Sequence, residues 1–325
     1  METFTAIEYL KIAISNTFGL DKLTWHERIH WADNFLQSVA SEQKVLIHGA
    51  NEPLLMQKAV TAYESAMIGE PTGYIMGLDA TASGIQLMAC LIGCHDTAKA
   101  VNLIDTGYRE DVYTDVAIEM GTTRVLCKPA VMTHFYGSKK QPESVFGEEV
   151  DKFYEAMERT LPGACEAMRD MQSCWQPFAK KHEFTLPDGH VASIKVMVPV
   201  DKRIEVDELD HATFTHRAYE NMGTERGLSL AANIIHATDG YVVREMYRMA
   251  KDQNFELLTI HDSFWCSPNY AQNIRQNYAD ILAGIADSDL MQDILRQVTG
   301  NGFLTYDKFS KDLGSLIRAS NYALS

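Results

Sequence analysis

Residues 255–264 read Phe-Glu-Leu-Leu-Thr-Ile-His-Asp-Ser-Phe, an apolar run that predicts a buried β-strand leading to Asp262. Residues 74–79, Tyr-Ile-Met-Gly-Leu-Asp, form a second such run that ends at Asp79. A buried carboxylate flanked by apolar residues is costly unless it is paired or bound to a metal, which singles out Asp262. Asp79 alone could be a helix N-cap, since aspartate is a preferred capping residue. Together the two stretches predict strand ends whose carboxylates can hold hard divalent cations.

A basic segment lies between the two aspartates. Arg124 and Lys128 are i,i+4 neighbours on a helix predicted over residues 124–136. A solvated cationic face is the simpler interpretation of these two charges. The dipeptide Tyr136-Gly137 favours a nucleobase-sized pocket at the helix end, and the cations would then hold a triphosphate. Pro129 removes a helix hydrogen bond, so the regular helix is expected to begin near Lys128 or to kink there.

The rest of the chain predicts helices with a few separated strands, which indicates an α+β fold. The tripeptide Pro187-Asp188-Gly189 between two β-prone runs predicts a hairpin over residues 183–198. The pair His95-Asp96 has a turn-like context and is interpreted as a solvated loop. The predicted helices cover most of residues 5–68 and the segments 85–92, 109–120, 124–136, 147–160, 163–181 and 227–250.

The composition is that of an ordinary globular protein of 325 residues, 46% hydrophobic and 22% charged. No window approaches the ~20 apolar residues of a membrane span, and the N-terminus lacks a signal-peptide pattern. A cytosolic location without membrane contact is therefore expected. The six cysteines include no C-x2-C pair, which disfavours zinc. The net charge of −15 argues against a nucleic-acid binder, unless basic residues line a cleft or another chain supplies positive surface.

Three motifs follow one another in a specific order along the chain. They are Asp79-x3-Ser83-Gly84-Ile85-Gln86, Arg124-x3-Lys128-x7-Tyr136-Gly137 and His261-Asp262-Ser263. Together they resemble the A, B and C motifs of the single-subunit RNA polymerases of bacteriophages and mitochondria. His-Asp-Ser alone is a weak signal, whereas all three motifs in this order are specific. Weaker similarity runs from Glu8 to Ser325, so the resemblance covers nearly the whole chain.

The resemblance implies an enzyme, a DNA-directed RNA polymerase that transfers nucleotides from nucleoside triphosphates to an RNA 3′-hydroxyl. Asp79 and Asp262 would hold two Mg²⁺ ions. Arg124 and Lys128 would neutralise the triphosphate, and Tyr136 would lie beside the incoming ribose and base. The residues with a catalytic role would be Asp79, Asp262, Lys128 and Tyr136, and those that bind substrate would be Arg124, Lys128, Tyr136, Gly137, Tyr113, His236, Lys22 and Gly84.

Two small residues imply RNA rather than DNA synthesis. Gly84 stands where related DNA polymerases place a bulky glutamate, which leaves room for a ribose 2′-hydroxyl. Ser263 stands where those enzymes tend to carry another glutamate. A fragment of such a DNA polymerase, or of a primase, is the alternative enzyme. A non-catalytic scaffold that only binds nucleic acid is the alternative outside the enzymes.

The implied architecture is the palm and fingers of a polymerase right hand, helix-rich with a small antiparallel palm sheet. A short promoter-recognition hairpin is expected within about 209–226, including Arg217 and Arg226. The expected divisions are residues 1–73 as a helical lead-in, 74–105 as the palm with the first aspartate, 106–200 as the fingers and 201–325 as the palm with the second aspartate.

Only 78 residues precede Asp79, so the thumb and the N-terminal domain of the family are expected to be absent. The resemblance then implies the catalytic subunit of a split, heterodimeric bacteriophage polymerase that acts in the host cytoplasm. The expected partners are a DNA template, the RNA product, nucleoside triphosphates and a second subunit with the missing domains. A single-stranded-DNA-binding protein that delivers melted template is a further candidate partner.

Overall fold

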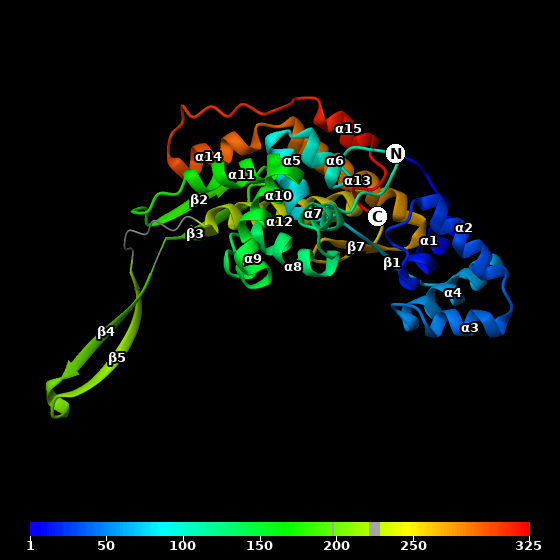
Figure 1. The fold of residues 1–325 in the computed structure, drawn as a ribbon, viewed down its shortest axis with the longest axis horizontal. Coiled ribbons are helices and arrows are strands. Elements are labelled where there is room, and N and C mark those ends of the chain that lie inside the picture. Colours follow the sequence, from blue (N-terminus) through cyan, green and yellow to red (C-terminus); the bar gives the residue numbers. More distant parts are fainter. Residues whose placement is uncertain (197, 221–227) are drawn as a thin grey trace.

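The computed structural model describes residues 1–196, 198–220 and 228–325. Helices dominate the chain, and its strands occur in short antiparallel sheets (Figure 1). This arrangement confirms the predicted α+β class, helix-rich with a small antiparallel sheet. Within the described residues, no helix is both long and apolar enough to cross a membrane.

One small sheet carries both aspartates. It consists of β1 (Met76–Asp79), β7 (Ser263–Cys266) and β6 (Leu258–Ile260), in that order and antiparallel throughout. Leu78 and Phe264 point into the core, because alternate side chains of a strand face opposite sides. β6 lies at the sheet edge, and its two apolar side chains are exposed. The prediction of a buried strand leading to Asp262 is therefore wrong for β6.

The helical core packs around this sheet. α5 (Ser83–Ile92) is apolar along most of its length, and its side chains from Ile85 onward are buried. α5 contacts both α13 (Ala271–Asp287) and α12 (Leu228–Asp252), and these two helices also contact each other. The helix predicted after β1 is confirmed.

A group of N-terminal helices lies beside β1 (Figure 1). α1 (Ala6–Phe18) contacts α2 (Trp25–Gln37), α4 (Pro53–Met67) and β1, while α3 (Ala40–His48) packs on α4. A threonine and a glutamate form a capping box at the start of both α1 and α2. The prediction of helices through most of residues 5–68 is confirmed.

The segment expected to form the fingers folds as a series of short helices. The expectation that the regular helix begins near Lys128 is wrong, because α8 begins at Arg124 and continues through Pro129. The buried face of the helix, formed by Cys127, Ala130 and Val131, continues across the proline, whereas Val125, Leu126 and Met132 are exposed. The last of these helices ends at Ser173 rather than near residue 181. The helices are α6 (His95–Ala100), α7 (Val112–Met120), α8 (Arg124–His134), α9 (Lys140–Phe146), α10 (Val150–Thr160) and α11 (Pro162–Ser173), and 3-10 turns cover Gly147–Glu149, Asp207–Leu209 and Pro268–Tyr270.

A first hairpin follows α11. β2 (Lys181–Thr185) and β3 (Val191–Lys195) are joined by the Pro-Asp-Gly turn, as predicted. β2 packs on α14 (Leu290–Thr299), and α15 (Leu313–Ala319) packs on α13. The C-terminal helices therefore support both the hairpin and the core.

A second hairpin projects far from the rest of the molecule (Figure 1). Its strands are β4 (Val198–Val206) and β5 (Ala212–Glu220). The hairpin therefore begins earlier than the segment 209–226 in which it was expected. Arg217 lies on β5, whereas Arg226 lies outside the described residues.

Candidate active site

Asp79 and Asp262 lie next to one another at one end of the sheet. Asp79 is the last residue of β1 and pairs with Ser263, which directly follows Asp262. The backbone N–H of Ala80 donates to the carbonyl oxygen of Asp262 over 3.1 Å. His261 and Asp262 form the two-residue turn between β6 and β7, where His261 takes the left-handed φ of 55° that such turns favour. The sheet thus brings together the two predicted carboxylates.

Both carboxylates remain accessible. Asp79 is exposed and Asp262 is partly exposed, so the expected enclosure of Asp262 by apolar neighbours is incomplete. The strands alternate, and residues at their ends face solvent while the preceding apolar residue faces the core. Within the described residues, no group of three Asp, Glu, His or Cys ligand atoms includes this pair. The site therefore offers carboxylate oxygens without a closed protein cage.

The last residues of the chain hold the end of β1 in place. The N–H of Ser325 donates to the carbonyl oxygen of Asp79 over 2.9 Å. Gln86 Nε2 donates to the carbonyl oxygen of Ala323 over 2.9 Å, and the Tyr278 hydroxyl donates to Gln86 Oε1 over 2.7 Å. Because Gln86 and Tyr278 are buried, this network fixes the backbone of Asp79 to the helical core.

A small pocket opens beside Asp262, lined in part by Gly84, Tyr113 and Tyr136. The ring of Tyr136 stacks on His236 of α12, with centroids 4.7 Å apart and planes 6° apart. A Cβ atom on Gly84 would lie 3.4 Å from the Tyr136 hydroxyl oxygen, so a longer side chain there would meet the tyrosine. The pocket thus presents an aromatic wall, with the Tyr136 hydroxyl close to Gly84.

Two cations border this pocket from α8. Arg124 forms an ion pair with Asp111, and its Nη2 lies 3.3 Å from Asp111 Oδ1. Lys128 is exposed and has no ion-pair partner among the residues that the structure describes. The two cations lie 5.4 and 5.6 Å from the centre of the Tyr113 ring, and burial raises the pKa of that tyrosine to about 12. Lys128 therefore supplies unneutralised charge, whereas the charge of Arg124 is shared with a carboxylate.

Five of the predicted substrate-binding residues do not line the pocket, namely Arg124, Lys128, His236, Gly137 and Lys22. Gly137 lies in the turn that follows the end of α8 at His134, and its φ of 78° is a left-handed value that glycine adopts without strain. Lys22 lies 2.8 Å from Asp21 in an ion pair. Burial and then the nearby charge of Arg109 lower the pKa of Lys22. Lys22 thus belongs to a separate charged cluster at the N-terminal side of the site.

Two charged residues near the aspartates were missed by the sequence analysis. Arg109 is partly buried, which lowers its pKa, and the nearby carboxylates of Asp79 and other residues oppose this shift. Asp239 of α12 is held by the Ser83 side chain, and burial and then the charge of Asp262 raise its pKa. Neither residue belongs to one of the three motifs, so it is identified as part of the site only by its position in the structure.

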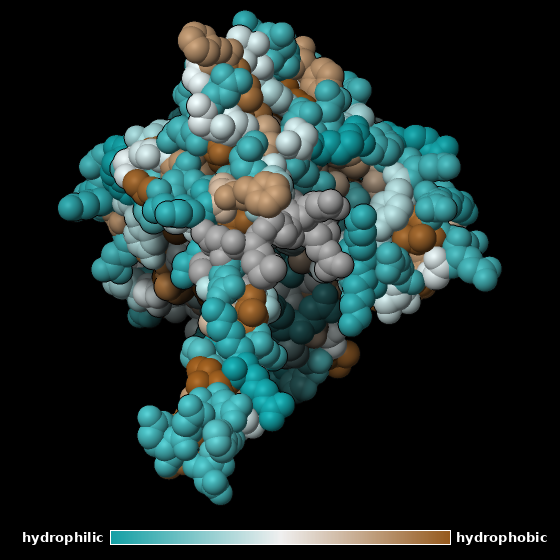
Figure 2. All heavy atoms as spheres, turned by 90° about the vertical axis from the view of Figure 1, so that its left-hand side faces the viewer, coloured by the Kyte–Doolittle hydropathy of each residue, from teal (hydrophilic) through white to brown (hydrophobic). Residues whose placement is uncertain are grey.

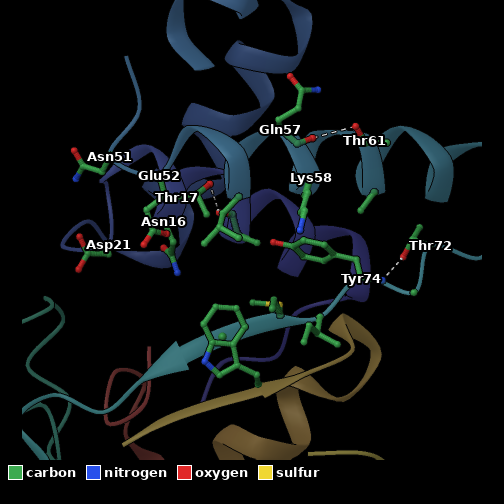
Figure 3. Close-up of a pocket in the computed structure, with 18 of the residues that line it drawn as sticks. Asn16, Thr17, Asp21, Asn51, Glu52, Gln57, Lys58, Thr61, Thr72 and Tyr74 are labelled. Atoms are coloured by element: carbon green, nitrogen blue, oxygen red, sulfur yellow. Dashed lines mark hydrogen bonds between the residues drawn. The ribbon is translucent and has the colours of Figure 1, made fainter. Parts of the chain in front are cut away.

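A groove of about 840 Å³ runs beside Asp79, between α1, α4 and the segment that leads into β1 (Figure 3). Lys58 and Thr61 come from α4, and Tyr74 reaches in from the opposite wall (Figure 3). Lys58 is exposed and has no ion-pair partner within the described part of the chain. The groove is therefore lined by both polar and apolar residues, and it carries Lys58 together with the carboxylates of Asp21, Glu52 and Asp79.

The indole of Trp265 forms part of the wall of this groove. Trp265 pairs with Gly77 across the strands, and a Cβ atom on Gly77 would come within 2.5 Å of the indole ring. Glycine is required there by this close approach. Trp265 Nε1 is buried and has no hydrogen-bond partner among the described residues.

His95 is not part of a solvated loop, so that interpretation is wrong. It begins α6, and its Nε2 lies 2.8 Å from Asp312 Oδ1 and 2.9 Å from the Ser310 hydroxyl. These contacts connect α6 to the segment before α15. The pair His95-Asp96 therefore starts a helix, and neither residue lines the pocket beside Asp262 or the groove beside Asp79.

Comparisons with known proteins give partial matches to DNA-directed RNA polymerases. Residues 3–121 match the family of DNA-dependent RNA polymerases. The mitochondrial DNA-directed RNA polymerase of Schizosaccharomyces pombe is 24% identical over 335 residues, which cover 80% of this chain and 28% of that protein. A probable DNA-directed RNA polymerase of Neurospora crassa is 26% identical over 176 residues, 46% of this chain and 19% of its own length. The chain thus spans less than a third of the length of these relatives.

A solved structure, the POL domain of Pol1 from M. smegmatis in complex with DNA primer-template and dNTP, is also similar. The similarity covers 88% of this chain and 64% of that chain, with a TM-score of 0.42 and 12% identity. At this level it carries no conclusion about this chain.

Proposed function

Because the chain is related to the DNA-dependent RNA polymerases, we propose that it carries the catalytic centre of DNA-templated RNA synthesis. The observation that carries the proposal is the placement of Asp79 beside Asp262 at the end of one sheet. A pocket opens beside Asp262 and a groove beside Asp79. Nucleotidyl transfer needs such a meeting point, because the incoming nucleotide and the 3′-hydroxyl must be held in contact.

The two carboxylates fit a pair of Mg²⁺ ions. Mg²⁺ takes one or two carboxylates together with substrate phosphates and water, and Asp79 and Asp262 are accessible oxygen donors. When bound there, the two ions would activate the 3′-hydroxyl and stabilise the departing pyrophosphate. Asp79 and Asp262 would be their protein ligands.

The side chains of α8 would hold the nucleotide. Among the described residues no carboxylate pairs with Lys128, so its charge is available to the triphosphate. Arg124 would contact the triphosphate while it stays paired with Asp111. Tyr113 positions both cations through its ring face. The nucleobase would lie against the stacked rings of Tyr136 and His236.

The small Gly84 favours a ribonucleotide. A Cβ atom there would already contact the Tyr136 hydroxyl, so a glutamate side chain would reduce the room for a 2′-hydroxyl beside the tyrosine. A site that hydrogen-bonds a substrate hydroxyl rejects the analogue that lacks it, because a buried polar group then loses its partner. Tyr136 is the residue that would make this bond.

The groove beside Asp79 would hold the growing end of the RNA. Nucleic-acid strands are bound by aromatic rings that stack on bases and by cations that contact phosphates. Trp265 and Lys58 supply one of each in the same groove. Lys22 would add positive charge from the adjoining cluster.

We also assign a second polypeptide to the working enzyme. The net charge of −15 is unfavourable for holding a template and a product, since phosphate contacts supply much of the affinity for nucleic acid. A basic second subunit would complete the nucleic-acid channel. The assembly would act in the host cytoplasm as a bacteriophage enzyme, with melted template delivered by a single-stranded-DNA-binding protein.

Primer extension tests this proposal. An RNA primer annealed to a DNA template is incubated with Mg²⁺ and ribonucleotides, using this chain alone or together with the basic product of a neighbouring reading frame. The assembled pair is expected to extend the primer, and the chain alone to do so at no more than about a hundredth of that rate. In the pair, Tyr136→Phe is expected to reduce the preference for ribonucleotides about tenfold.

Each competing function gives a different result in this assay. Faster incorporation of deoxyribonucleotides by the unmodified pair would identify a DNA polymerase. Template binding without any incorporation would identify a scaffold. Processive synthesis by the purified chain alone would remove the need for a second subunit.

A further inference from the structure

In the part of the chain that the structure describes, the hydrogen bonds and ion pairs of the β4–β5 hairpin stay within the hairpin. Among the described residues, every hydrogen bond and ion pair of residues 198–220 joins two residues of the hairpin. Figure 1 shows the ribbon extending away from the core into solvent. A lone two-stranded hairpin is marginally stable in water. The ribbon therefore lacks the packing against other elements that would stabilise a hairpin of this length.

One face of the ribbon is largely apolar. Residues paired across two antiparallel strands share a face, and every second pair falls on the same side. Ile204 pairs with Phe214, and their side chains are 38% and 52% exposed. Two further pairs on this face are apolar, Val200 with Ala218 and Val206 with Ala212, whereas Lys202 with His216 and, at the end of the ribbon, Glu220 interrupt the apolar face. Figure 2 shows brown apolar side chains on the lower projection, among teal hydrophilic ones.

The charges of the hairpin oppose contact with DNA. Residues 198–220 contain six Asp or Glu residues against three Lys or Arg residues. Arg217 is paired with Asp201 and Lys202 with Glu220, while Arg203 donates to the Thr213 hydroxyl over 3.1 Å. Carboxylates thus neutralise Lys202 and Arg217, and Arg203 is the one of these three cations whose partner is uncharged.

The tip of the hairpin is the most acidic part. Glu205, Asp207, Glu208 and Asp210 lie within six residues there, and His211 pairs with the first two. A phosphate backbone would be repelled by this tip rather than attracted. A protein surface with basic residues around an apolar strip would match both the tip and the apolar face.

We propose that the apolar face of the β4–β5 hairpin binds the second subunit, on an apolar strip bordered by Lys and Arg residues. This assignment rests on the proposed function, which requires that subunit, and it gives the hairpin a protein partner instead of a DNA partner. A second copy of this chain does not fit, because its net charge of −15 would add to the repulsion at the tip. The hairpin would reach across to the second subunit and hold it in place.

Binding measurements with matched variants test the assignment. The double variant Ile204→Asp with Phe214→Asp places two charges on the apolar face. The control, Thr215→Asp with Tyr219→Asp, places two charges on the opposite face and also removes an exposed aromatic ring. Affinity for the basic neighbouring gene product is measured by titration, and affinity for a duplex DNA is measured in parallel.

The apolar-face variant is expected to bind the second subunit at least about 30-fold more weakly, and the control to stay within about threefold. Duplex binding should be the same for both variants, and both should melt at the temperature of the unmodified chain. Glu205→Lys with Glu208→Lys should also weaken subunit binding, and less so at high salt.

Three results would overturn the assignment. If the apolar-face variant bound the second subunit normally while the unmodified pair synthesised RNA, the hairpin assignment would fail and the proposed function would stand. If that variant lost duplex binding instead, the hairpin would contact DNA. If the unmodified chain bound no second subunit and the mixture made no RNA, the proposed function would fail first and the assignment with it.

Discussion

The two hairpins formed by β6–β7 and β4–β5 differ in what surrounds them. The turn of the first carries Asp262, and its strand β7 is paired with β1 and buried against the core through Phe264. The second has longer strands and a continuous ladder, yet its side chains are largely exposed and bonded within the ribbon. Strand length therefore does not decide which hairpin can carry a catalytic residue. A reacting group needs a hairpin whose strands are fixed by a core, whereas a ribbon without one is suited to contact another molecule.

The largest expected effect comes from removing one carboxylate on the packed hairpin. Asp262→Asn in the assembled enzyme should lower the rate of primer extension at least about 10³-fold, because an amide is a poor ligand for the metal ions. The same change on the projecting hairpin, Asp201→Asn, should leave the rate within about twofold. Single-turnover extension measures both, and equal rates for Asp262→Asn and the unmodified enzyme would remove this residue from catalysis.

Replacing a phenylalanine by alanine should change the free energy of unfolding by different amounts in the two hairpins. Phe264 is 1% exposed and Phe214 is 52% exposed. Phe264→Ala should lower the free energy of unfolding by about 3–5 kcal/mol, since it leaves a cavity in the core. Phe214→Ala should change it by no more than about 0.5 kcal/mol. Urea unfolding of the two variants gives the comparison, and a similar loss for both would show that the ribbon is packed against the body in solution.

The pH dependence of stability should also differ between a carboxyl group of the packed body and one of the ribbon. Burial, with the charges of Glu110 and Asp111, raises the pKa of Asp115 on α7 to about 6. Because this folded-state pKa lies above the unfolded value, the fold is stabilised by the protonated form and loses that stability as the pH rises from about 4 to 6. Asp115→Asn should remove this loss and stabilise the chain by ~1–2 kcal/mol at pH 7, after allowance for its partial exposure.

The ribbon provides the control for this titration. A hydrogen bond from Arg217 lowers the pKa of the fully exposed Asp201, so its contribution would be lost as the pH falls. Asp201→Asn should not alter the slope between pH 4 and 6. Thermal melts across this range decide the matter, and an unchanged slope in Asp115→Asn would show that another group causes it.

The sequence predicted the parts of the site that lie within local patterns. Asp79 and Asp262 end apolar runs, the three motifs name α5, α8 and the β6–β7 turn, and the Pro-Asp-Gly turn was found from its residue types. The sheet that brings the two aspartates together follows from pairing those runs. These features depend on neighbours within a few residues, which a single sequence does contain.

Other features depend on contacts between distant segments. The pairing of Arg124 with Asp111, the position of Arg109 and the contact of Trp265 with Gly77 follow from packing, which no local pattern encodes. The helix through Pro129 is kept by the buried side chains around it, against the local propensity. The ribbon was expected within residues 209–226 on the resemblance alone, whereas its strands pair residues 198–206 with residues 212–220.

The close contact between Trp265 and Gly77 also gives the groove an optical signal. Indole emission depends on the polarity and hydrogen bonding around the ring, and the N–H of Trp265 is buried without a partner among the described residues. A nucleobase that stacks in the groove would therefore change the emission without any added label. Subtracting the spectrum of a Trp265→Phe variant isolates that change, whereas the pocket beside Asp262 has no tryptophan in its lining. Filling of the groove can thus be timed separately from filling of the nucleotide pocket.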